Sequence, residues 1–571
     1  MKRNKTQKVG RIPLPRDRVR AEAPAITWTA FRWRDEASAT DLLEVRFPAA
    51  GGGEGSAFLP VSVVDNPQRL IAGLRDKGAR LPMERAARDV VLADLIAGIP
   101  DHPGLQAARA GWHDDAFLFV EEPINGDANK IRLRDDIALK APELGGAAGI
   151  LSRWQATVAQ PASQSSYVSF GLMAALAAPI ARFAALDEGA IFNFHGISST
   201  GKTTALFAAL SVAGAASDLL DWNATGRALH ERSAAHSDLP MILDDLERFR
   251  SDHGGRARSL SNRLHTITGG HSSSTSTVVR DNLPELNWWA WVLSSGPRSI
   301  REEFARDRLE PTIGDERRWI DIEVPAAGNG GIWDRVAPRE TLRQLSERSE
   351  ALKLACRANY GRPMRQWLRH LTFNYATIPE IVRAHIDRFI ALACPEGSGV
   401  DRSVARKIGT VYAAGQIAIQ IGLLPWSQGF VAEVCTNLLS GYVRSSQRRE
   451  RAAGQARSAL KALSMDRQRV PVIRSGSPQF LAEDDCDGFR QVRNSVDALY
   501  LRRETIERVC GVVCEQIISE LEAAGALNRG QGGKKSVQVR VSLGGEDLKM
   551  RFLTFNPALF EQALSTPVPT T

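Results

Sequence analysis

The spacing of apolar residues changes along the chain and predicts where strands and helices lie. Residues 25–35 and 41–50 alternate apolar and polar side chains, which is the two-residue period of half-buried strands. A helical pattern follows over residues 67–98, and residues 110–123 return to strand character. Together these elements predict a small α+β domain over residues 26–145.

Short apolar strands alternate with helical or polar stretches in the next part of the chain. The candidate strands are AIFNFHG, LPMILDD, WWAWVLSS and RWIDIEV. This alternation is typical of an α/β layer on a largely parallel sheet. An alanine-rich, helical run over residues 171–186 leads into it. We therefore place an α/β core at residues 146–330.

The rest of the chain is predicted to be helical and then to end in a helix and a hairpin. Residues 331–450 are mostly helical in pattern, and two alternating runs, SVQVRVS and DLKMRFLTF, follow an amphipathic helix near the C-terminus. This order predicts a winged-helix-like domain over residues 451–571, with Arg540, Lys549 and Arg551 on the outer face of its wing. Such modules bind either DNA or proteins, so the fold leaves the partner open.

The basic residues of the chain are concentrated at the N-terminus. The formal net charge is +8, and in residues 1–20 eight basic side chains stand against the single acid Asp17. We expect residues 1–25 to form a disordered basic tail that adds nonspecific, salt-sensitive affinity for phosphates. The densest other basic run, residues 444–461, is either a solvated helix face or a DNA contact.

The bulk composition is that of a soluble globular protein, with 43% hydrophobic and 24% charged residues among 571. We find neither a secretory signal nor an apolar run that predicts a membrane span, so we expect a cytoplasmic protein without membrane contact. The six cysteines are scattered and are expected to be core thiols, with neither zinc nor disulfides.

Residues 192–210, FNFHGISSTGKTTALFAAL, place a glycine-containing loop between a strand and a helix. The loop fits the pattern G-x-x-x-x-G-K-[ST], in which backbone N–H groups and the helix N-terminus surround an anion. Lys202 would meet the β/γ-phosphates of ATP, and Thr203 would ligate Mg²⁺. A structural turn is the alternative. Nucleotide contacts are expected at Gly196, Ser199, Thr200, Gly201, Lys202, Thr203 and Thr204.

A phosphate loop also needs an acidic strand, and the run LPMILDD supplies one. Asp244 would hold Mg²⁺ through water, and Asp245 stands where a carboxylate polarises the attacking water. Many such ATPases have glutamate at the second position. Because aspartate is one methylene shorter, either the water lies closer or hydrolysis is slow. Two acids that merely cap a strand are the alternative.

Two further candidates come from the strands that follow. Ser294 ends an apolar strand and could orient the water or reach the γ-phosphate as a sensor, although serines at strand ends are also turn formers. Arg317 and Arg318 precede the last strand, from which an arginine could reach a neighbouring subunit's ATP site. Surface ion pairing is the alternative for both arginines.

The order of these motifs resembles a known family, the bacterial proteins that carry domain of unknown function 927. This family includes self-loading helicases of mobile chromosome cassettes and phage-like elements. The similar blocks are GWHDDAFLF, GILSRW, FHGISSTGKTTAL, DWNAT, LPMILDD and WVLSSG, with YGRPMRQWL and AAGQIAIQIGLLPW downstream. The run RRWIDI also resembles the arginine-finger segment of superfamily-three helicases.

The resemblance implies a P-loop ATPase of AAA+ or superfamily-three helicase type that forms hexameric rings and translocates on DNA, with ATP between subunits. It makes Lys202 a phosphate contact, Thr203 a magnesium contact and Asp244 the carboxylate that holds the metal. Asp245 would be the catalytic acid, Ser294 the sensor, and Arg318 the arginine finger that acts in trans on a neighbouring subunit. Two departures concern the hydrolysis rate: Asp245 replaces glutamate, and Pro297 follows Gly296 where the family commonly has an acid.

The sequence thus supports two functions of different classes. The first is an ATP-dependent DNA helicase or translocase for replication of a mobile element, acting on single-stranded or forked DNA. The alternative is an ATP-binding assembly or switch protein with weak or no hydrolysis. Residues 265–282 would form either a DNA-gripping hairpin that carries Arg280 or a surface loop.

Overall fold

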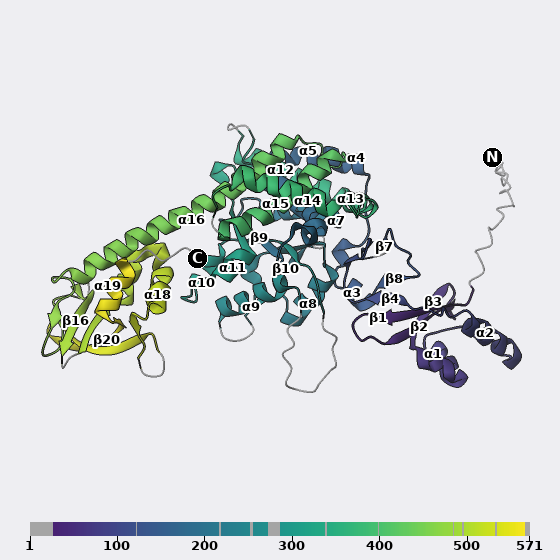
Figure 1. The fold of residues 1–571 in the computed structure, drawn as a ribbon, viewed down its shortest axis with the longest axis horizontal. Coiled ribbons are helices and arrows are strands. Elements are labelled where there is room, and N and C mark those ends of the chain that lie inside the picture. Colours follow the sequence, from purple (N-terminus) through teal and green to yellow (C-terminus); the bar gives the residue numbers. More distant parts are fainter. Residues whose placement is uncertain are drawn as a thin grey trace, which may run out of the picture. The chain divides into compact units, whose positions relative to one another are not determined.

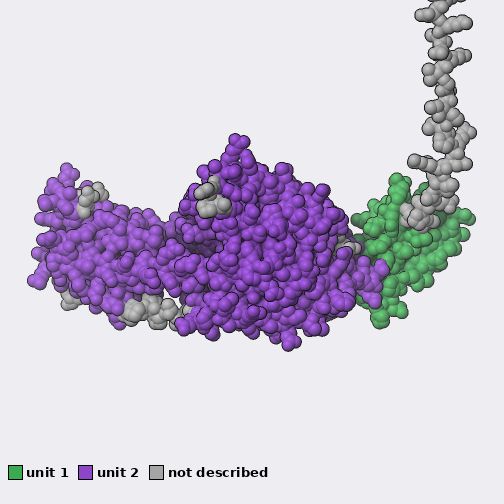
Figure 2. All heavy atoms as spheres, turned by 90° about the horizontal axis from the view of Figure 1, so that it is seen from above, with its two compact units in different colours: residues 1–106 green, residues 107–571 purple. Residues whose placement is uncertain are grey.

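The structure is a computed structural model that describes residues 27–565, except for 121–122, 216–218, 252–254, 272–285, 337–339, 398, 483–484, 494–495 and 531–533. The chain forms two compact units that divide between residues 106 and 107 (Figure 2). The predicted basic tail and Arg280 lie outside the described residues.

The first unit packs two helices against a small sheet. Strands β3, β2, β1 and β4 follow one another in that order, antiparallel except for the β1–β4 pair. Their inward-facing residues, Leu43, Val45 and Phe47 among them, form the core together with leucines of the two helices. The elements are β1 (Thr29–Asp35), β2 (Asp41–Pro48), β3 (Glu54–Pro60), α1 (Pro67–Asp76), α2 (Arg85–Ala97) and β4 (Gly104–Ala107).

The second unit is built on a five-stranded parallel sheet in the order β10-β11-β12-β9-β13. The predicted parallel α/β layer is therefore confirmed, and each of the four predicted strands is present. The sequence pattern missed β10 because it has only two residues. The strands are β9 (Ala190–His195), β10 (Leu220–Asp221), β11 (Pro240–Asp244), β12 (Trp291–Gly296) and β13 (Trp319–Glu323).

Helices cover both faces of this sheet, which is why its central strands read as continuous apolar runs. On one face Ile191, Leu243 and Val292 pack against α8 and α9. On the other, Phe192 stacks edge-on against Phe170 of α6, with ring centroids 5.3 Å apart. The helices are α6 (Ser166–Ala177), α7 (Lys202–Ala213), α8 (Gly226–Ala235), α9 (Arg256–Gly269), α10 (Ile300–Ala305) and α11 (Ile313–Arg318).

Short elements connect the start of the second unit to this sheet. They are β5 (Gly111–His113), β6 (Ala116–Leu118), β7 (Pro123–Ile124), β8 (Ile131–Leu133), α3 (Asp135–Ala138), α4 (Leu151–Trp154) and α5 (Gln160–Ala162). Residues Ser166–Ala184 meet the length and hydropathy of a membrane span, but 89% of the span's most apolar window is buried in the fold. In this structure they form a core helix.

In the described part of residues 331–465, five helices follow the sheet, as the pattern of residues 331–450 predicts. The last of them, α16, continues for 38 residues without a break (Figure 1). It runs through residue 450, where the sequence placed a domain boundary, and the five-part division of the chain stays a prediction. The helices are α12 (Leu342–Ala358), α13 (Arg362–Phe373), α14 (Ile378–Ala393), α15 (Gly399–Gln420) and α16 (Gln428–Met465).

The basic run on α16 separates into two sets of arginines. Arg449 lies 3.3 Å from Glu316 of α11, and Arg457 lies 3.0 Å from Glu520 of the C-terminal part, so both join elements within the fold. Three others, Arg444, Arg448 and Arg451, are exposed. The solvated-face interpretation therefore applies only to part of the run.

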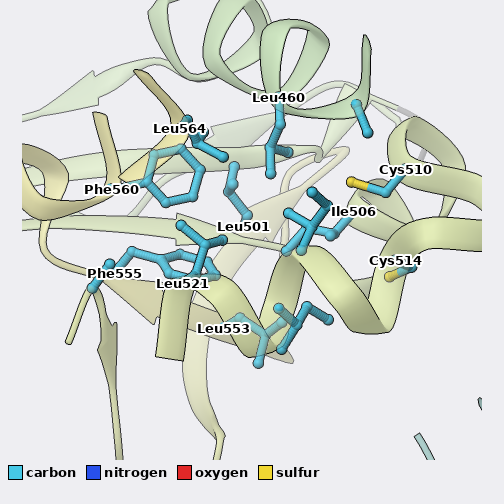
Figure 3. Packing of buried hydrophobic residues seen from close by; sticks show 14 of the residues in the cluster. Leu460, Leu501, Ile506, Cys510, Cys514, Leu521, Leu553, Phe555, Phe560 and Leu564 are labelled. Atoms are coloured by element: carbon cyan, nitrogen blue, oxygen red, sulfur yellow. The ribbon is translucent and has the colours of Figure 1, made fainter. Parts of the chain in front are cut away.

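The C-terminal part packs the end of α16 and the helices α17, α18 and α19 onto a mixed sheet whose central strands are antiparallel. Its core joins Leu460 of α16 to Ile506, Leu521, Leu553 and other apolar residues (Figure 3). The pairing order β16-β17-β20-β19 contains the predicted hairpin. The elements are β16 (Gly488–Arg493), β17 (Val496–Leu501), α17 (Arg503–Cys510), α18 (Cys514–Ala523), β19 (Ser536–Leu543), β20 (Glu546–Phe555) and α19 (Pro557–Ser565).

The six cysteines are buried, as expected of core thiols. Burial raises the pKa of Cys356, Cys510 and Cys514 to about 12, so these thiols stay protonated and unreactive at neutral pH.

Candidate nucleotide-binding site

The glycine-containing loop lies between β9 and α7, at the carboxyl edge of the parallel sheet. Gly196 has φ +141°, and a Cβ there would lie 2.6 Å from the carbonyl oxygen of Val324. Gly201 has φ +93°, and its Cβ would lie 2.7 Å from the side chain of Ile332. Both positions thus require glycine for conformation and for space. Ser199 also adopts a left-handed conformation, with φ +63°.

Lys202 folds back over the loop that precedes it. Its ammonium donates hydrogen bonds to the carbonyl oxygens of Gly196 and Ile197, both at 2.7 Å, and lies 3.3 Å from the Thr200 hydroxyl. Burial lowers the pKa of Lys202, and the charge of Asp244 partly opposes that shift. The lysine is therefore held at the mouth of the loop, where phosphate oxygens could replace the carbonyl acceptors.

The acidic strand brings its carboxylate to the start of α7. The hydroxyl of Thr203 lies 3.3 Å from Oδ1 of Asp244. These are two hard oxygen ligands of the kind that Mg²⁺ prefers, so the residues present fit this ion. Thr203 and Asp244 are 41 positions apart in the chain. They meet because only β12 lies between β11, which ends at Asp244, and β9, which leads into the loop.

Asp245 directly follows the strand in a left-handed conformation, with φ +54° and ψ 76°. Such a backbone costs a non-glycine residue about 1 kcal/mol and is typical of functional sites. Its carboxylate is half-exposed and lies 3.4 Å from Nε of Arg248. Asp245 thus pairs with an arginine of the turn that follows it, while Asp244 contacts Thr203 at the start of α7.

The two serines at the end of β12 point to opposite sides, as successive strand residues do. Ser294 is buried and accepts a 2.9 Å hydrogen bond from the indole of Trp222. Ser295 instead donates to Asp244 and accepts a 3.4 Å hydrogen bond from the backbone N–H of Asp245. We expected the sensor at Ser294 rather than at Ser295, because the two-residue period of the strand separates the two faces without showing which of them meets Asp244.

Arg318 lies at the other edge of the sheet. It ends α11 directly before β13, whose first residue, Trp319, is level with Ile191 of β9. Five strand residues, or about 17 Å, separate this level from the loop. Its guanidinium pairs with Glu188 at 2.7 Å and donates to the carbonyl of Gly314 at 2.9 Å. Within one subunit, Arg318 is thus not brought to the Lys202–Asp244 pair.

Lys407 of α15 shares this acid with Arg318. Its buried ammonium lies 3.3 Å from Glu188 and donates to the carbonyl of Arg317. Burial is the largest cause of its pKa falling to about 8, which the charge of Glu188 only partly offsets. Helix α15 thereby contacts the segment that carries Arg318, the predicted arginine finger.

Lys407 gives a testable dependence of stability on pH. Because its pKa is about 8 in the fold and 10.5 ordinarily, the unfolded chain binds more protons between these values. The folded state therefore gains stability as pH rises through this window, by up to about 1.4 kcal/mol per pH unit, and gains nothing below it. We expect the difference in free energy of unfolding between wild type and Lys407→Met, measured with urea, to rise with this slope. If the free energies of unfolding of the two proteins changed with pH in parallel, the lowered pKa of Lys407 would be contradicted.

Comparisons with known proteins agree with this geometry. Residues 43–263 match the profile of domain of unknown function 927, a segment that contains the phosphate loop and Asp244. No curated protein matches the chain. One solved structure, titled "SCCmec type IV Cch - active helicase", is 15% identical with a TM-score of 0.58, and the similarity covers 95% of both chains. At this identity the likeness shows a shared fold. The match to the domain of unknown function 927 thus confirms, over residues 43–263, the resemblance predicted from the motifs.

Proposed function

We propose that this protein is an ATP-dependent DNA helicase or translocase that serves replication of a mobile element. The observation that carries the proposal is the 3.3 Å contact between Thr203 and Asp244 at the start of the helix that follows the lysine-containing loop. A loop that binds phosphates and a carboxylate that holds their metal ion are the two parts that P-loop ATPases share. The fold shared with a structure titled as an active helicase supports the choice of motor.

Each residue of the site would have its own role in ATP hydrolysis. The N–H groups of residues 196–204 and the α7 N-terminus would bind the phosphates, and Lys202 would neutralise the γ-phosphate as its charge develops. Thr203 and Asp244 would hold Mg²⁺, which supplies further neutralisation when bound. Ser295 holds Asp244 in place and binds the backbone of Asp245. Asp245, on its turned backbone, would orient the attacking water.

The position of Arg318 supports action between subunits. It lies at the amino edge of the sheet while the loop lies at the carboxyl edge, so it could reach only the nucleotide of a second copy. A ring of identical subunits supplies such a copy at every interface, because head-to-tail contacts close into rings. We propose a hexamer of this kind, with Glu188 as the partner that Arg318 leaves when it contacts the neighbouring phosphate.

One observation favours the alternative, an ATP-binding switch with weak hydrolysis. The shorter carboxylate of Asp245 lies 3.4 Å from Arg248, which itself pairs with Asp221 at 2.8 Å. An arginine at that distance competes with water for the carboxylate. The motor and the switch therefore differ in whether Asp245 releases Arg248 when ATP is bound.

ATP turnover of Asp245 variants tests the proposal. We expect single-stranded DNA to raise the turnover of wild type, and Asp245→Asn to lower it at least ~100-fold while ATP still binds, because the water loses its orienting carboxylate. Asp245→Glu should equal or exceed wild type. Turnover is measured by phosphate release and ATP binding with a fluorescent analogue. Stoichiometric ATP binding without turnover in wild type would select the switch, and turnover that DNA does not change would reject the helicase.

A further inference from the structure

The hairpin near the C-terminus has one apolar and one charged face. Val541 and Phe552, on its inner face, are buried in a small core with Phe489. On the outer face, Arg540 stands directly opposite Lys549 and Gln538 opposite Arg551, so that all three basic side chains lie on the same side. The expectation that they share the outer face is therefore in agreement with the register. We call Arg540, Lys549 and Arg551 the outer wing face.

The outer wing face carries positive charge without internal compensation. All three side chains are exposed, and none of them has a hydrogen-bond or ion-pair partner among the residues that the structure describes. Asp547, two positions before Lys549 on the same face, is the nearest acid along the strand, and it forms no ion pair with described residues. Like charges directly opposite each other destabilise a hairpin. This arrangement leaves three cations open to an anionic ligand from outside the fold.

Several other basic residues of the C-terminal part are paired within it. Arg503 pairs with Glu515, Arg457 with Glu520 at 3.0 Å, and Lys535 with Glu522 at 2.7 Å. The three glutamates all belong to α18, whose sequence CEQIISELEA contains no lysine or arginine.

The helix α18 is consequently unsuited to DNA. In helix-turn-helix proteins the second helix of the pair enters the major groove, where phosphates line both sides. The pair formed by α17 and α18 puts an acidic helix in that place, and its apolar side, with Cys514 and Leu521, is buried in the core (Figure 3). The helix itself offers phosphates no lysine or arginine. The wing is therefore the part of this module that fits a polyanion.

We propose that the outer wing face binds the phosphate backbone of DNA, without reading base sequence. The proposal rests on the proposed function, because a translocase needs contacts that every sequence offers. Lys549 and Arg551 are two strand positions apart, or about 7 Å, and Arg540 lies about 5 Å across the hairpin. Three cations in such a cluster contact two or three phosphates, and binding then depends steeply on salt.

The test uses the full chain with Arg540→Gln, Lys549→Gln and Arg551→Gln combined. Binding to a fluorescent duplex, and to a single strand of equal length, is measured without ATP across a range of salt concentrations. For the duplex we expect affinity to fall about 10- to 100-fold at ~0.1 M salt, and the slope of log K against log salt to fall by about 2 to 3. Duplexes of unrelated sequence should be affected equally. The single strand shows whether the face prefers one form of DNA.

The matched control removes the same charge elsewhere. Arg343, Arg369 and Arg383 are exposed on α12, α13 and α14, and their combined change to glutamine should leave the salt slope unchanged. Lys549→Gln alone should lower the slope by about 1. The melting temperature of the triple variant should equal or exceed that of wild type, because repulsion is relieved.

Each outcome separates this proposal from the proposed function. If the triple variant binds DNA with the slope of wild type, the outer wing face does not bind DNA, and an acidic protein surface becomes its ligand instead. An equal loss in the control variant would also overturn the proposal. If wild type itself binds no DNA in any form, the proposed helicase function fails first.

Discussion

Changing Lys202 to alanine is expected to lower ATP turnover at least ~100-fold, the loss typical of removing one preorganised charge donor. The fold should survive, because among the described residues the ammonium bonds to its own loop and forms no ion pair with an acid. Phosphate release measures the turnover, and circular dichroism with the melting temperature monitors the fold.

The control for this variant is Lys353→Ala on α12, which removes an ammonium that pairs with Glu350 at 2.9 Å. It should leave turnover unchanged. If Lys202→Ala keeps the activity of wild type, the loop is not the catalytic site, and the roles given to Thr203 and Asp244 fail with it.

Arg318→Ala is expected to lower turnover about 10³-fold, at the lower end of the effect of an arginine supplied in trans. ATP binding should persist, because Arg318 lies at the opposite edge of the sheet from the loop. Arg317→Ala serves as the neighbouring control and should retain most of the activity. Phosphate release and binding of a fluorescent ATP analogue measure the two properties.

Mixing two inactive variants tests whether the arginine acts between subunits. In an equal mixture of Lys202→Ala and Arg318→Ala subunits, about a quarter of ring interfaces would combine an intact loop with an intact finger. We expect the mixture to recover activity that neither variant has alone. A mixture as inactive as its components would place Arg318 outside the catalytic machinery.

Local sequence was sufficient to predict the elements that build the candidate site. The loop between β9 and α7 and the acidic end of β11 are each encoded within a few residues, by glycines and by an apolar run that ends in two aspartates. The pattern also indicated the parallel sheet. Their contact could be expected because parallel strands end at one edge, and the Thr203–Asp244 distance agrees with it.

Contacts between distant segments could not be predicted in this way. Neither Glu188 nor Lys407 follows a motif, yet both contact the segment of Arg317 and Arg318. The choice between Ser294 and Ser295 depends on which face of β12 meets Asp244, and this is a matter of strand order. The strand β10 was missed because two residues are too few to show the alternation of apolar and polar side chains.

The unbroken course of α16 has a mechanical consequence. Arg449 forms an ion pair with Glu316 of α11, beside β13. Two turns later on the same helix, Arg457 forms an ion pair with Glu520 of α18. A continuous helix is stiff over its length, about 57 Å in this case. Any tilt that a bound nucleotide imposed where Arg449 is anchored would therefore be transmitted along α16 to the C-terminal strands and their charged face.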